Sequence, residues 1–168
     1  INYAAPLNCK KLHCMAGLTP AQYSNALIEE TFIRNIQFAA DLGQAHNIEI
    51  MIEPINTRDI PGYFLNYSDQ AKRLMKKIDR SNVGLQYDIY HMQIMEGDLV
   101  PTIKRLLPQI KHIQLADTPG RHEPGTGEIN YPFVFSTLDA LGYDGWIGCE
   151  YQPQKDTISG LNWLTPYL

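Results

Sequence analysis

A short apolar run followed by a stretch with helical spacing recurs along this chain, at about 30 residues per repeat. The apolar runs are rich in β-favouring residues, and five of them are predicted as strands within 12–17, 48–56, 84–93, 110–117 and 145–153. Strands that alternate with helices favour a parallel sheet built from βαβ units. The repeat therefore indicates an α/β fold.

The segments between these runs carry apolar residues at helical spacing, which predicts four helices. We expect them at about 25–44, from an N-cap at Ser68 through 78, at about 98–107, and from an N-cap at Asn130 to a stop at Gly142. A further short helix is expected within 159–168. Each predicted strand is therefore followed by helical structure.

Length, charge and cysteine content restrict the classes of protein to which this chain can belong. The 168 residues carry a net charge of −4 and no basic stripe, which argues against nucleic acid as a partner. No apolar run has the length of a membrane span, and the start lacks the layout of a signal peptide. Cys9, Cys14 and Cys149 have no metal-binding spacing and are expected to be reduced thiols. We expect one domain over residues 1–168, located in the cytoplasm, with no membrane partner.

The fold class follows from where the polar residues lie. No GxGxxG motif follows the first strand, so a dinucleotide-binding fold has no support from motif. A TIM-type barrel explains the pattern better, because its active sites are built where the strands end. Such a barrel has eight strands, and five are predicted here. We expect a partial barrel, which leaves three explanations open: a shortened form or fragment, an open sheet, or a homo-oligomer in which a second copy completes the barrel.

Four of the predicted strands end in a side chain that can bind metal or move protons, namely Glu53, Asp88, Gln114 and Glu150. Alternate residues of a strand face opposite sides of the sheet, and all four residues fall on the same side. The residues that share this side with them are Met51, Gln86, His112 and Trp146. We expect the four strand-end side chains to point into the barrel near its C-terminal rim.

These four side chains offer only oxygen ligands, which suit Mg²⁺ or Mn²⁺ best and leave Zn²⁺ or Co²⁺ open. A divalent cation would offset the cost of placing carboxylates in a barrel lumen. It would also polarise a substrate carbonyl, beside which a carboxylate could remove a proton. Simpler interpretations exist: the glutamates could be solvated, Asp88 could cap the next turn, and Gln114 could bridge backbone groups.

Two further residues are candidates for substrate binding. His91 lies beyond the strand that carries Asp88, either as a partner of the site or as a surface loop residue. Arg121 lies in the Gly- and Pro-rich loop 118–130 after Gln114, and its planar guanidinium suits a carboxylate substrate. The remaining histidines considered, His13, His46 and His112, are expected to be structural.

Several segments together resemble the hydroxypyruvate isomerase branch of the xylose isomerase-like TIM-barrel superfamily: IEPIN, residues 86–91, IQLADTPGRHEPGTGEINYP and GWIGCEYQP. The resemblance covers nearly the whole chain and corresponds to the C-terminal five βα units of the family barrel, about strands 4–8. It implies that Glu53 and Glu150 are the acid/base pair and also metal ligands. It further implies that Asp88 and Gln114 complete the metal site, and that His91 and Arg121 hold the substrate. The expected substrate is then a small 2-oxo or 2-hydroxy acid, with ketoses also open.

The reaction implied by the resemblance interconverts hydroxypyruvate and 2-hydroxy-3-oxopropanoate through an enediolate, with Mg²⁺ as the expected ion and Mn²⁺ as the alternative. Sister epimerases that resemble this pattern carry His where Gln114 stands, so the glutamine favours the hydroxypyruvate branch. Two alternatives stay open: a related sugar epimerase or isomerase, and an inactive shortened form that binds metal or a partner. An apurinic endonuclease is disfavoured, because it would need more His ligands for several zinc ions and a positive surface.

Overall fold

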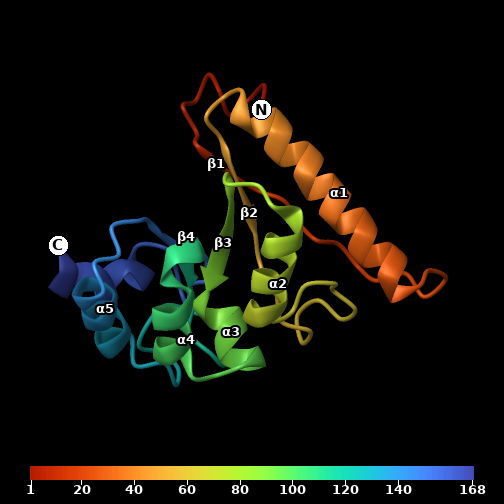
Figure 1. The fold of residues 1–168 in the computed structure, drawn as a ribbon. Helices are drawn as coiled ribbons and strands as arrows, with labels where there is room; N and C mark the ends of the chain where they lie inside the picture. The colour runs from red at the N-terminus through yellow and green to blue at the C-terminus, as the bar shows by residue number, and fades with distance from the viewer.

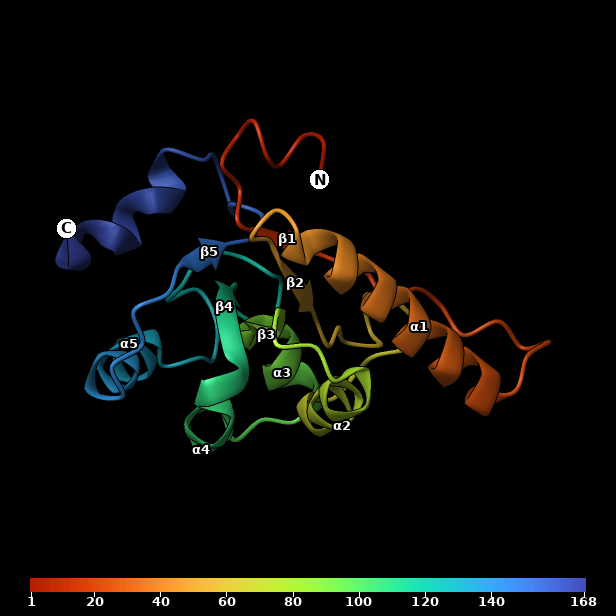
Figure 2. The ribbon, with the colours of Figure 1, turned by 45° about the horizontal axis from the view of Figure 1, so that its top comes forward.

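The computed structural model describes all of residues 1–168, and its five strands form one parallel sheet in the order β1-β2-β3-β4-β5. The strands are β1 (Lys11–His13), β2 (Glu49–Ile52), β3 (Val83–Asp88), β4 (Ile110–Leu115) and β5 (Ile147–Cys149). Each strand pairs with the next one along the chain, as Figure 1 shows for β1 to β4, so β1 and β5 are the edges of the sheet. The sheet curls into a half-barrel, and Figure 2 shows the arc of its strands. The prediction of a partial TIM-type α/β barrel is confirmed.

Helices cover the outer side of the curled sheet. They are α1 (Asn25–Gln44), α2 (Ser68–Ile78), α3 (Ile89–Met95), α4 (Leu99–Leu106) and α5 (Tyr131–Ala140). Figure 2 shows α1, α2, α4 and α5 along the outside of the arc of strands, whereas α3 follows β3 directly. Short 3₁₀-helices are found at Leu107–Gln109 and Ser159–Tyr167. None of the helices has the length and apolar character needed to cross a membrane.

The helix starts show what local sequence can and cannot predict. Asn130 caps α5 as expected, because its side-chain oxygen accepts the Phe133 N–H at 3.3 Å. Ser68 does not cap α2 but is its first residue, and its N–H and hydroxyl both donate to the Glu96 carboxylate, at 2.6 and 2.8 Å. The predicted N-cap at Ser68 was wrong because an acidic side chain 28 residues away provides the partner at this helix end.

The two faces of the sheet differ as strand alternation requires. The outward-facing residues of the central strands are fully buried under the helices: Ile50, Ile52, Leu85, Tyr87, Ile113 and Leu115. On the inner face lies a hollow of about 620 Å³, whose lining includes Met51, Gln86, His112 and Trp146. The predicted parity of the strands is therefore confirmed, and the polar strand ends face the same side as this hollow.

Candidate functional site

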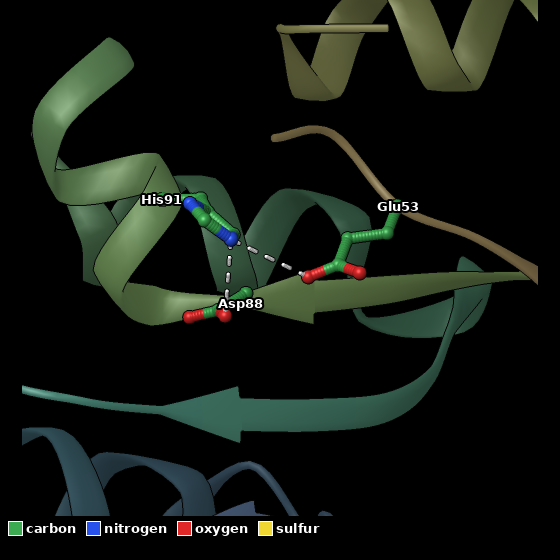
Figure 3. Close-up of side chains that lie close together, drawn as sticks. All are labelled: Glu53, Asp88 and His91. Atoms are coloured by element: carbon green, nitrogen blue, oxygen red, sulfur yellow. Dashed lines mark ion pairs between the residues drawn. The ribbon is translucent and has the colours of Figure 1, made fainter. Parts of the chain in front are cut away.

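Glu53, Asp88 and His91 come together where β2 and β3 end. Glu53 directly follows β2, Asp88 is the last residue of β3, and His91 lies in the first turn of α3. All three residues are buried, with 4%, 0% and 2% of their surface exposed. One ligand atom from each residue lies within 4.8 Å of the others, which is close enough to share one metal ion (Figure 3).

The junction between β3 and α3 gives Asp88 two separate functions. Its Oδ1 accepts the Tyr90 N–H at 2.8 Å and so caps α3, which confirms the capping interpretation. Its Oδ2 has no hydrogen-bond partner and lies 3.6 Å from His91 Nε2. The cap orients the carboxylate and leaves its second oxygen directed at the site.

Glu53 is held in a similar way, by one oxygen only. Its Oε2 accepts a hydrogen bond from Gln86 Nε2 at 2.9 Å and lies 3.4 Å from His13 Nδ1. Its Oε1 has no partner and lies 3.9 Å from His91 Nε2. Two buried carboxylate oxygens without partners thus face the same space, an arrangement that is costly unless a proton or a cation is bound there.

Burial shapes the protonation of this cluster. Burial, together with the nearby charges of Asp88 and Glu150, raises the pKa of Glu53 to about 8. Burial also raises the pKa of Asp88 to about 7 and lowers the pKa of His91 to about 4. The cluster resists negative charge in the metal-free protein, so a bound divalent cation would favour the ionised carboxylates.

Gln86 connects the cluster to β4. Its side-chain amide donates to Glu53 Oε2 and also to Gln114 Oε1, the latter at 2.5 Å. Gln114 is half-buried and lies directly opposite Asp88 in the register of β3 and β4. Strand alternation predicted that Gln86 lies on the inner face, but it did not indicate a role for Gln86 in the site. Its parity with Asp88, two positions later in the same strand, is the signal that could have identified it.

Glu150 and Arg121 lie at the rim of the site. Glu150 follows β5 and is exposed, and its Oε2 accepts a hydrogen bond from Arg121 Nη2 at 2.8 Å. The Arg121 guanidinium stands 5.2 Å from the centre of the Tyr90 ring and 3.9 Å from Asp59 Oδ2. The structure therefore gathers Glu53, Asp88 and His91 into one buried cluster. Gln114 joins it through Gln86, and Glu150 sits beside it in an ion pair with Arg121.

Two neighbours of the cluster were not assigned a role from the sequence. His13, expected to be structural, contacts the Glu53 carboxylate from β1, and its Nε2 is buried without a partner. Asn56 is completely buried and contacts His91 from the loop after β2. His13 pairs in register with the inward-facing Met51, so parity could have indicated it, whereas nothing in the sequence pattern indicated the contact of Asn56.

The fold and the cluster define a class of protein. A family model described as the xylose isomerase-like TIM barrel matches residues 1–167, and the chain belongs to this family. The family resemblance inferred from the motifs is confirmed.

Curated relatives place the chain within the family. It is 48% identical over 168 residues to a 2-oxo-tetronate isomerase from Cupriavidus necator, and 46% identical over 167 residues to a hydroxypyruvate isomerase from Escherichia coli. These alignments cover 100% and 99% of this chain, and the chain spans 65% of the length of each relative.

Solved structures agree on the fold. The crystal structure of AP endonuclease, family 2 from Brucella melitensis superposes with a TM-score of 0.96 and 47% identity, over 99% of this chain and 64% of that one. The IOLI protein, solved with a bound zinc atom, superposes with a TM-score of 0.74 at 18% identity, over 92% and 58% of the two chains. The second likeness supports the fold alone.

Proposed function

We propose that this chain carries the site of a metal-assisted isomerase that acts on a small 2-oxo acid with a hydroxyl group on the neighbouring carbon. The observation that carries the proposal is the pair of buried oxygens, Glu53 Oε1 and Asp88 Oδ2, that face one space without hydrogen-bond partners. The curated relatives are named for hydroxypyruvate and 2-oxo-tetronate, both of which are 2-oxo acids. We propose hydroxypyruvate as the first substrate to test and 2-oxo-tetronate as the second.

The residues present fit a divalent cation. Glu53 and Asp88 would hold it through their free oxygens, and Gln114 and Glu150 would complete an all-oxygen set. When bound, the ion supplies positive charge beside the oxygens of the substrate, where negative charge develops during proton transfer. Mg²⁺ is the ion we propose, with Mn²⁺ as the alternative, because both prefer oxygen ligands.

The chain's own residues would move the protons. One glutamate, Glu53 or Glu150, removes a proton from the hydroxyl-bearing carbon, and an enediolate forms. A proton then returns to the neighbouring carbon, while the hydroxyl proton passes to the former carbonyl oxygen, so the carbonyl changes place without a net change in atoms. Burial raises the pKa of Glu53 to about 8 in the metal-free protein, and a bound cation would favour the ionised carboxylate that a base requires.

We expect His91, a member of the cluster, and Arg121, at its rim, to orient the substrate. Arg121 already pairs with a carboxylate, that of Glu150, and its guanidinium could exchange this partner for the substrate carboxylate. His91 faces the space between Glu53 and Asp88 with one ring nitrogen. Both residues would hold the substrate with the reacting carbons near the glutamates.

The experiment is an isomerisation assay of the 168-residue chain on hydroxypyruvate and on 2-oxo-tetronate, each with and without Mg²⁺ or Mn²⁺. Glu150→Gln removes a proposed base and should abolish turnover, whereas the exposed Glu30→Gln, on α1, is the matched control and should not change it. Metal-dependent turnover of either acid that is lost in Glu150→Gln supports the proposal. A folded, metal-loaded chain that converts neither acid contradicts it.

A further inference from the structure

His91 has different neighbours at its two ring nitrogens. Nδ1 lies 2.7 Å from Asn56 Nδ2 and 3.4 Å from the Asn56 backbone nitrogen. Nε2 faces the opposite way, toward Asp88 Oδ2 at 3.6 Å and Glu53 Oε1 at 3.9 Å (Figure 3). A neutral imidazole carries one proton, and the hydrogen bond made by one nitrogen decides the state of the other.

The orientation of the Asn56 amide is fixed from outside the cluster. The Asp59 backbone N–H donates to Asn56 Oδ1 at 2.8 Å, and Asn56 Nδ2 donates to Asp59 Oδ2 at 3.1 Å. A backbone N–H can only donate, and an ionised carboxylate can only accept. A flipped amide would therefore set donor against donor and acceptor against acceptor at the same time, so Nδ2 is the atom that faces His91.

With the amide held in this way, Asn56 directs two N–H groups at His91 Nδ1. Nδ1 must accept, because a proton on it would oppose a donor only 2.7 Å away. The ring proton therefore lies on Nε2. A ring nitrogen that carries a proton has no lone pair for a metal ion, although Nε2 is close enough to two carboxylates to share one with them.

We propose that Asn56 is a positioning residue that keeps the His91 proton on Nε2, so that His91 serves the site as a hydrogen-bond donor and not as a metal ligand. The metal would then be coordinated by oxygen atoms only, and the Nε2–H of His91 could donate a hydrogen bond to an oxygen of the substrate. This role deepens the proposed function and rests on it for the identity of the metal and the substrate. The tautomer itself depends only on the contacts of Asn56.

The test is long-range ¹H–¹⁵N NMR of the histidine rings in the labelled, metal-free chain at pH 8, with His91→Gln to assign the His91 signals. The wild type should show a protonated Nε2 and a bare Nδ1. Asn56→Asp replaces the donor with an acceptor, so Nδ1 should gain a proton. Asn66→Asp is the matched control, because Asn66 Nδ2 donates to Ile55 O and does not touch His91.

A proton on Nδ1 in the wild type, or a bare Nδ1 in a folded Asn56→Asp variant, would overturn the inference. Repeating the wild-type measurement with saturating Mg²⁺ tests whether His91 is a metal ligand. If it is not, Nε2 should keep its proton when the ion binds. Loss of that proton would make His91 a ligand and would also overturn the inference. Failure of both Mg²⁺ and Mn²⁺ to bind would contradict the proposed function and leave the tautomer result standing.

Discussion

Raising the pH from 6.5 to 8.5 should destabilise the metal-free protein. The pKa of Glu53 is raised to about 8 and that of Asp88 to about 7, both chiefly by burial. In this window the folded chain holds protons on these carboxyl groups that the unfolded chain has already lost. The stability that these protons provide is therefore lost as the pH rises through the folded-state pKa values.

The magnitude follows from these values. Glu53 should lose about 2 kcal/mol of its contribution to the free energy of unfolding between pH 6.5 and 8.5, and Asp88 about 1 kcal/mol. His13, His91 and His112 have lowered pKa values, and their contribution to stability changes in the opposite direction near pH 6.5. We expect a net loss of about 1 to 2 kcal/mol.

Urea unfolding at the two pH values measures this loss, with Glu53→Gln as the comparison. Glutamine cannot ionise, so the variant should lack the Glu53 share, about 2 kcal/mol of pH dependence. Saturating Mg²⁺ should reduce or reverse the wild-type loss, because a bound cation stabilises the ionised carboxylates. Equal pH dependence in the wild type and in Glu53→Gln would refute the argument that burial of Glu53 sets its ionisation.

Three further changes test other parts of the structure. Gln86→Leu should weaken Mg²⁺ binding in calorimetric titration by about tenfold or more, because Glu53 and Gln114 lose their shared donor, whereas Gln93→Leu on α3 should not. Gly127→Ala should lower the free energy of unfolding, measured by urea denaturation, by roughly 1–3 kcal/mol, because a Cβ there would lie 2.2 Å from Thr118 O. Leu85→Ala should cost about 2–5 kcal/mol in the same assay, since the side chain is completely buried.

Most of what the sequence predicted correctly about the site came from strand alternation, which indicates the residues that share a face of the sheet. A period of two along β3 determines that Gln86 and Asp88 share a face and that Leu85 and Tyr87 occupy the other, wherever the strand is packed. The start of α3 could not be read in this way. Residues 89–95 are apolar enough to continue a strand, but the strand predicted within 84–93 ends at Asp88, whose side chain caps the helix that begins at Ile89.

The contacts that define the site were decided by tertiary structure. Asn56 and His91 are 35 residues apart, and Arg121 and Glu150 are 29 apart, so their meeting depends on sheet register and on how the loops cross the rim. Burial is also a tertiary property: Glu53 and Glu150 each directly follow a strand, yet Glu53 is enclosed and Glu150 is exposed. Side-chain pattern thus determined which residues face inward. Only packing decided which of them lose water, and desolvation is what shifts their pKa values and leaves carboxylate oxygens without partners.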